Sequence, residues 1–168
     1  GEIINDSTIL NNKNIIIEGG GGRGKLNNNN YSYFENLTNG TITINFGQIT
    51  NSNQSIFKNR DLITNSPAGI IILDDSTTFT NYGKINNSGR IDNNDSSIFD
   101  NTTTGEFNNL FNASNNFIND NILLNSGKFI NNGGFYNKKN GKLINNDIFK
   151  NMLNSIFTNE SLIEIKNT

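Results

Sequence analysis

The feature that most constrains this chain is a short repeat, Gly-x-Ile/Phe-x-Asn, that keeps to odd-numbered positions from residue 45 to residue 167. Clear copies occupy residues 83–87, 89–93, 127–131 and 141–145. In this span ten of eleven Phe, eight of nine Gly and 20 of 29 Asn are odd-numbered, whereas 16 of 21 charged residues are even-numbered. Copies follow one another mostly at steps of six or eight residues. Because side chains of an extended chain alternate between two faces, even steps keep the repeat on one face.

A ribbon that keeps one inner face over this length is predicted to coil, because it lacks regular Asn-Gly hairpin turns between alternating strands. We therefore predict an all-β fold, a parallel β-solenoid with essentially no α-helix. Its inward core is predicted to consist of Ile49, Phe57, Ile63, Ile71, Phe79, Ile85, Ile91, Phe99, Phe107, Phe129, Phe135, Leu143, Phe149 and Phe157.

Asn is expected at the corners, where it tolerates the left-handed conformation, and stacked inward Asn side chains can form amide ladders. The predicted corner residues are Asn51, Asn59, Asn65, Asn87, Asn93, Asn101, Asn131, Asn137, Asn145 and Asn151.

Grouping three repeats gives turns of mostly 20–22 residues: from Ile49 the steps lead to Ile71, Ile91 and Phe117. This spacing favours three short strands per turn and a triangular cross-section; the alternative, two strands per turn, would give less regular turns of roughly 12–18 residues. About eight turns at ~4.8 Å per turn would make a rod of roughly 40 Å. We predict a single solenoid domain over residues 1–168, with the regular repeat in residues 45–167. In residues 19–47 the apolar positions become even-numbered, and an irregular loop or bulge is expected there.

Composition excludes several classes of function. The formal net charge is −2, which offers no basic surface for nucleic acid. The chain has no Cys and no His, so no cofactor is predicted, and it has no run of 18 apolar residues, so no membrane insertion is expected. The sequence begins with Gly1 rather than Met, so we expect either that an N-terminal segment has been removed, as in a secreted protein, or that the sequence is a fragment. The expected location is extracellular or on a cell surface.

The run Gly-x-Ile-x-Asn-x-Gly-x-Ile-x-Asn at residues 83–93 resembles the haemagglutinin-type repeats of filamentous-haemagglutinin-like and autotransporter adhesins. The resemblance covers about three quarters of the chain as a degenerate pattern. It implies a secreted parallel β-helix that acts as an adhesin shaft and possible contact with a host-surface glycan.

Three patterns suggest chemistry. Residues 19–25 match the Gly-x4-Gly-Lys of a phosphate-binding loop, but Leu26 follows where Ser or Thr is required. The densest carboxylates, which a polysaccharide-active β-helix enzyme could use, are Asp74, Asp75, Asp92, Asp95 and Asp100. Thr50, Thr64 and Thr78 are spaced by 14 residues, as an outward ice-binding row would require. A turn, a solvated acidic surface and an irregular Thr distribution are the simpler interpretations, and no enzymatic activity is predicted.

The predicted outer face also carries apolar residues, namely Ile56, Ile70, Ile72, Ile98, Ile118, Ile130, Ile144, Ile148 and Ile156. They fit either half-covered strand positions or an interface with another subunit. Neither end of the sequence shows a capping helix. The leading hypothesis is therefore a non-enzymatic extracellular structural protein whose partners are copies of itself, joined end to end or laterally in a fibre. The alternatives are a shaft fragment of a bacterial adhesin or phage tail fibre, and a polysaccharide-active enzyme.

Overall fold

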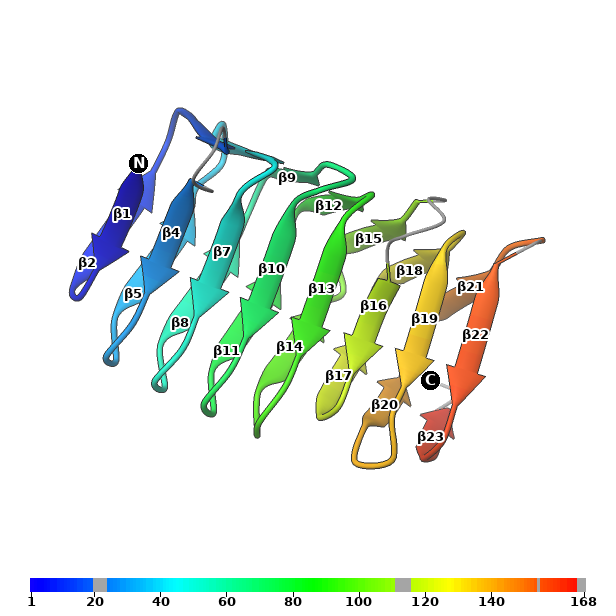
Figure 1. The fold of residues 1–168 in the computed structure, drawn as a ribbon. Coiled ribbons are helices and arrows are strands. Elements are labelled where there is room, and N and C mark those ends of the chain that lie inside the picture. The colour runs from blue at the N-terminus through cyan, green and yellow to red at the C-terminus, as the bar shows by residue number, and fades with distance from the viewer. Residues whose placement is uncertain (20–23, 111–115, 154, 166–168) are drawn as a thin grey trace.

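The computed structural model describes residues 1–19, 24–110, 116–153 and 155–165, and all of its regular elements are β-strands. The strands form three parallel sheets that wind around one core, so the predicted solenoid with three strands per turn is confirmed (Figure 1). The 23 strands make seven complete turns and two strands of an eighth.

Each turn contributes one strand to each sheet, in the order A, B, C. Sheet A contains β1 (Glu2–Asn5), β4 (Lys25–Asn28), β7 (Gln48–Asn51), β10 (Ile70–Leu73), β13 (Arg90–Asn93), β16 (Asn116–Asn119), β19 (Gly134–Asn137) and β22 (Ile156–Asn159). Sheet B contains β2 (Thr8–Asn11), β5 (Tyr33–Asn36), β8 (Ile56–Asn59), β11 (Thr78–Asn81), β14 (Ile98–Asn101), β17 (Ile122–Asn125), β20 (Lys142–Asn145) and β23 (Leu162–Ile165). Sheet C contains β3 (Asn14–Glu18), β6 (Thr41–Asn45), β9 (Leu62–Asn65), β12 (Lys84–Asn87), β15 (Glu106–Asn109), β18 (Lys128–Asn131) and β21 (Ile148–Asn151).

The even steps of the sequence have a simple structural origin. Most strands have four residues, and most corners between them have two residues, such as 82–83, or four, such as 102–105. A strand plus a corner is then six or eight residues long, so each strand starts in the same phase. The predicted register is confirmed, because Ile49, Ile71, Ile91 and Phe117 are successive partners in sheet A.

Residues 19–47 are more regular than the expected loop, because they contain β4, β5 and β6. The phase changes at β3 and β6, which have five residues each, whereas the stretches after them, 19–24 and 46–47, have the even lengths of six and two residues. The inward residues Ile42 and Ile49 are seven residues apart, an odd step that passes through the exposed, left-handed Phe46 (φ 56°). The irregularity is therefore one extra residue in each of two strands, and these strands still continue the stack.

The core is a column of apolar side chains that runs the length of the rod. In turns two to five, Phe34, Phe57, Phe79 and Phe99 stack in sheet B with ring centroids 4.5–5.2 Å apart. Beyond Phe99 the rings move to the other two sheets: the sheet A series begins at Phe117 and the sheet C series at Phe107, while sheet B contributes Leu123 and Leu143. Phe99 contacts Phe107 and Phe117 edge to face where the two arrangements meet.

Glycine ends many corners because the chain passes very close to the neighbouring turn. A Cβ on Gly127 would collide with the carbonyl oxygens of Thr102 and Gly105. The left-handed corner positions are instead filled by other residues, such as Asn53 with Gln54 and Asp75 with Ser76. Close approach, rather than positive φ, is thus the requirement that selects Gly in the repeat.

Candidate functional surfaces

The structure brings most of the predicted core and corner residues into one interior. Of the predicted core, Ile49 through Leu143 are buried, and Phe149 and Phe157 near the C-terminal end of the rod are partly buried. The predicted Asn residues from Asn51 to Asn145 are also buried, whereas Asn151 at the C-terminal end is exposed. Each of these Asn residues is the last residue of a strand and points inward just before the corner.

The buried Asn side chains form three amide ladders along the rod. In each ladder the Nδ2 of one Asn donates to the Oδ1 of the Asn one turn later, over 2.6–2.8 Å. Among the described residues there are five such bonds in sheet A, six in sheet B and four in sheet C. The same Nδ2 groups also donate to corner carbonyls, as Asn101 does to Gly105 over 3.1 Å. The ladders therefore tie strands to corners as well as turn to turn.

All the ladders have one polarity, and two interruptions reveal it. Leu73 replaces Asn between Asn51 and Asn93 in sheet A, and the Oδ1 of Asn93 is left without a partner. Ile44 precedes Asn65 in sheet C, and the Oδ1 of Asn65 is likewise unpaired. Each ladder begins with an acceptor and ends with a donor, so the two ends of the rod are chemically different.

Both ends expose strand edges and apolar side chains. At the N-terminal end a hollow of about 410 Å³ is lined by Ile3, Ile16, Ile17 and neighbouring residues. At the C-terminal end the core opens into a hollow of about 300 Å³ lined by Phe149, Phe157, Ile163, Ile165 and adjacent ladder residues. A solenoid interior that opens at both ends presents surfaces for further strands.

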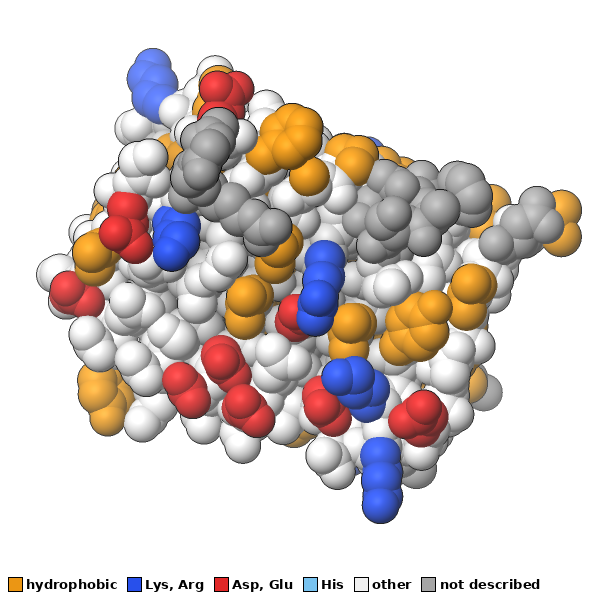
Figure 2. Space-filling model, in the orientation of Figure 1, with side chains coloured by type: hydrophobic (Ala, Val, Ile, Leu, Met, Phe, Trp, Pro, Cys, Tyr) orange, Lys and Arg blue, Asp and Glu red, His pale blue; other side chains and the backbone are white. Residues whose placement is uncertain are grey.

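The sides of the rod are less apolar than the sequence suggested. Six of the nine outward Ile residues, from Ile70 to Ile144, are half-buried by their neighbours, and only Ile56, Ile148 and Ile156 are exposed. On the face shown in Figure 2, hydrophobic side chains lie among charged and polar ones, without a continuous stripe. Half-covered strand positions therefore account for most of the outward Ile residues.

The predicted carboxylates lie on different parts of the surface. Asp74, Asp75 and Asp95 lie in the stacked corners between sheets A and B. Burial, followed by a hydrogen bond to Asp95, raises the pKa of Asp74. Asp92 is in β13, where its Oδ1 accepts a 2.8 Å hydrogen bond from Arg90, and Asp100 is in β14 of sheet B.

Burial raises the pKa of Asp100. Among the described residues no three His, Cys, Asp or Glu side chains are placed to hold a metal ion. Asp74 and Asp95 therefore lie close together. Neither of them faces Asp92 or Asp100 across a cleft in the described part of the chain.

A cluster of aromatic and charged residues covers turns two to four of sheet B. Glu35 is buried and accepts hydrogen bonds from Tyr33 (2.5 Å) and Arg60, while Arg60 also lies over the ring of Tyr82. Burial opposes ionisation of Glu35, but the bonds from Tyr33 and Arg60 lower its pKa overall. Burial and the bond to Glu35 raise the pKa of Tyr33 to about 12. These charges are partnered within the cluster, which supports the outer face of the sheet.

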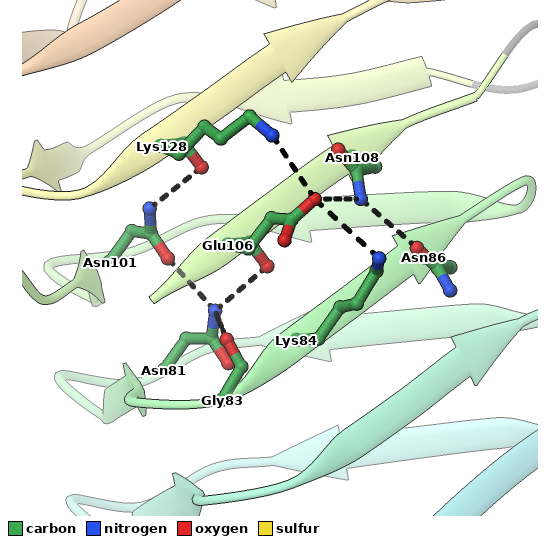
Figure 3. A network of polar contacts seen from close by, with 8 residues as sticks. All are labelled: Asn81, Gly83, Lys84, Asn86, Asn101, Glu106, Asn108 and Lys128. Carbon is green, nitrogen blue, oxygen red and sulfur yellow. Dashed lines mark hydrogen bonds and ion pairs between the residues drawn. The ribbon is translucent and has the colours of Figure 1, made fainter. Parts of the chain in front are cut away.

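Sheet C carries a second charged network, shown in Figure 3. Glu106 lies between Lys84 and Lys128, with each Nζ 3.5 Å from its Oε1, and Asn108 donates to the same oxygen over 3.0 Å. The hydrogen bond from Asn108, together with the two lysines, lowers the pKa of Glu106. The inner ladder bond from Asn81 to Asn101 runs close by (Figure 3). The ion pairs and amide bonds on the outer face of sheet C thus also connect successive turns.

The other sequence patterns do not form sites in the described residues. In the Gly-rich run, residues 20–23 lie outside the described residues, and Lys25 begins β4 rather than a helix. Thr50, Thr64 and Thr78 lie in sheets A, C and B respectively, so they do not share a face. No helix that could span a membrane occurs in the described part of the chain.

Sequence reasoning missed part of the interior. The missed core residues include Leu26, Phe34, Ile42 and Ile44 in the phase-shifted turn, and Leu73 and Leu123. The missed ladder residues are Asn5, Asn11, Asn28, Asn36, Asn81, Asn109, Asn119, Asn125 and Asn159. Their common signal is an Asn two positions after an inward apolar residue, whether or not a Gly precedes it.

Comparison of the chain with protein-family models, with curated proteins and with solved structures gives no match.

Proposed function

We propose that this chain is a non-enzymatic structural protein, a β-solenoid subunit of an extracellular fibre or surface filament. The observation that carries the proposal is the position of the exposed apolar residues. Of the twelve large apolar residues exposed among the described residues, eight belong to the first three or last three strands or to the corners between them: Ile3, Ile4, Leu10, Ile16, Ile148, Leu153, Ile156 and Ile165. The partner that buries them in this proposal is another copy of the chain.

The interior supports a structural role. The Phe column and the amide ladders repeat from turn to turn, so a subunit that adds its own turns can extend the same interactions. The backbone groups at a strand edge are unpaired until another strand arrives, which makes an open solenoid end prone to pairing. Contacts between two different surfaces of one chain generate an open filament rather than a closed ring.

Negative-stain electron microscopy of the purified chain at high concentration tests the proposal. Filaments of the width of one rod are expected, and a uniform population of short monomers would rule the proposal out. Two matched variants separate end growth from lateral growth. Ile165→Asp places a charge on the C-terminal end, where Ile165 is 70% exposed, and is expected to shorten the filaments. Ile56→Asp places the same charge on the side and is expected to leave filament length unchanged.

A shaft segment of a bacterial adhesin or phage tail fibre is the second candidate, and the open ends favour it too. In that arrangement further turns of a longer polypeptide would cover the ends, and a host-surface glycan would be the distant partner. This candidate predicts that the 168-residue chain stays monomeric at every concentration tested by analytical ultracentrifugation.

A further inference from the structure

The outermost strands at the two ends of the rod belong to different sheets: β1 lies in sheet A and β23 lies in sheet B. Within the described residues, sheets A and B contain eight strands each and sheet C contains seven. The last three described strands are therefore β21 in sheet C, β22 in sheet A and β23 in sheet B, and they form a stepped edge. The first three, β1, β2 and β3, form the opposite stepped edge in the order A, B, C. In an uninterrupted solenoid the strand after β23 would pair with β21.

We propose that a second copy of the chain docks on the C-terminal end turned about the rod axis by one sheet position, about 120°. Its β1, β2 and β3 then pair with β21, β22 and β23 of the first copy. The inference rests on the proposed function and adds the register of the contact. Strands four residues long and corners of two or four residues recur in all three sheets, so the turned copy meets equivalent geometry.

The other rotations leave strand positions empty. A copy docked without rotation pairs β1 with β22 and β2 with β23. Its β3 then faces β21 across two strand spacings, about 9.6 Å. The remaining rotation pairs β1 with β23 but separates both other strands in the same way. The turned register is the one in which every edge strand gains a neighbour.

The side chains match in the turned register. The inward residues Ile3, Ile9 and Ile15 stack on Phe149, Phe157 and Ile163, which continues the apolar column. At the strand ends, Asn5 meets Asn151 and Asn11 meets Asn159.

The third strand end is the most specific match. In β3 the position that later carries Asn is occupied by Ile17, and in β23 it is occupied by Ile165. The turned register places these two isoleucines on each other. The unrotated register would place Asn11 on Ile165 and leave its amide facing an apolar side chain.

Ladder polarity fits the same contact. The ladders end in donors at the C-terminal end, where the Nδ2 of Asn159 bonds Ser161 O over 2.7 Å. They begin with acceptors, because the Oδ1 of Asn5 and of Asn11 accept only backbone N–H groups, at 3.2 Å. In mid-rod the Oδ1 of Asn28 accepts both Asn5 and Ser32, so a ladder oxygen has room for a second donor. Docking can therefore continue two ladders without breaking existing bonds.

Exposed charges complement each other at the edge. Glu2 comes diagonally beside Lys150, within reach for long side chains on parallel neighbours. Lys13, in the corner after β2, comes over the corner that contains Glu160. The contact thus joins apolar stacking, amide bonds and opposite charges in one register.

Cysteine cross-linking tests the register, because the chain has no Cys of its own. The variant with Ile4→Cys and Lys150→Cys puts two thiols on neighbouring strands in the turned register, at a Cα separation suited to a disulfide. The variant with Ile4→Cys and Thr158→Cys does so only in the unrotated register. After oxidation and non-reducing electrophoresis, we expect the first variant to give a ladder of covalent multimers. The second should give at least tenfold less, and Ile4→Cys alone should give no species beyond a dimer.

A second variant tests the Ile17–Ile165 match without a cross-link. Ile165→Asn sets an amide against Ile17 in the turned register and is expected to shorten filaments. In the unrotated register it would meet Asn11 and lengthen them. Three results would each overturn the proposed register and leave the fibre proposal standing. They are multimers from the variant with Ile4→Cys and Thr158→Cys, longer filaments of Ile165→Asn, and filaments that give no cross-link in either double-cysteine variant. Absence of filaments and multimers in every variant would overturn both.

Discussion

The contribution of the amide ladders can be measured at Asn101, in the middle of the sheet B ladder. This fully buried side chain accepts from Asn81 and donates to Asn125 (both 2.8 Å), to Gly105 O (3.1 Å) and to Lys128 O (3.2 Å). Asn101→Ala removes these four bonds and leaves the Oδ1 of Asn125 buried without its ladder donor. At about 0.5–1.5 kcal/mol for each bond, with about 1–3 kcal/mol for a stranded buried acceptor, the expected loss of unfolding free energy is roughly 3–9 kcal/mol.

Urea denaturation followed by circular dichroism measures this loss. The matched control is Asn108→Ala in the next strand, where a half-buried, outward amide bonds Asn86 and Glu106. Its expected cost is below about 1 kcal/mol, because water replaces those bonds. Equal losses in the two variants would refute the idea that the ladders stabilise the rod.

Asn101→Asp separates the loss of donors from the loss of volume. Aspartate has nearly the same shape, but its carboxylate would point acceptors at the oxygens of Asn125, Gly105 and Lys128. At neutral pH we expect Asn101→Asp to be less stable than Asn101→Ala, and to recover part of the difference in acid, where the carboxyl regains one donor. A stable Asp variant at pH 7 would show that ladder polarity has no energetic weight.

Three further predictions concern the interruption, the corners and the acidic edge. Leu73→Asn should change the unfolding free energy by less than about 1 kcal/mol, because a restored ladder offsets the lost apolar burial. Leu123→Asn in mid-core should lower the unfolding free energy by about 3–5 kcal/mol. Equal urea midpoints for the two variants would contradict this prediction. Inserting one Gly after Ser126 should unfold the turns that follow, because it moves their inward side chains to the outer face. Inserting two Gly residues keeps the inward side chains inside and should be tolerated. Hydrogen exchange of residues 128–165 distinguishes the two variants. Burial and the bond to Asp95 raise the pKa of Asp74, so its contribution to stability is present in acid and lost as pH rises through the folded-state pKa. Asp74→Asn should therefore raise the unfolding free energy by less than about 1 kcal/mol at pH 7 and leave it unchanged at about pH 3, as thermal melts at the two pH values would show; a destabilised variant at pH 7 would contradict the assignment.

The sequence predicted those parts of the structure that depend on parity alone. Even steps place Phe57, Phe79 and Phe99 on one face, and the structure stacks them as successive partners in one sheet. Residues 19–47 were misjudged because the odd step from Ile42 to Ile49 makes regular strands look irregular when only one phase is followed. One extra residue in each of the five-residue strands β3 and β6 is enough to shift the phase without breaking the stack.

The parts that the sequence could not predict depend on three-dimensional neighbours. Whether an Asn donates forward or backward along the rod is set by which amide lies next to it, and residue spacing does not encode this. The unpaired oxygens of Asn65 and Asn93 follow from Ile44 and Leu73 one turn earlier, a relation that appears only once the strands are aligned. The number of strands in each sheet likewise depends on how the strands are assigned to the three sheets, which appears only in the structure.

The ladders also bear on the chemical ageing of this Asn-rich chain. Asn converts to Asp most readily when Gly follows, because the small residue leaves the backbone nitrogen open to attack the amide. The chain has three Asn-Gly pairs, beginning at Asn39, Asn132 and Asn140, and all three lie in corners outside the ladders. Every ladder Asn is followed by a larger residue and is held by hydrogen bonds. Spontaneous deamidation is thereby directed to the surface, where an added negative charge costs little, and away from the positions where a carboxylate would disrupt the interior.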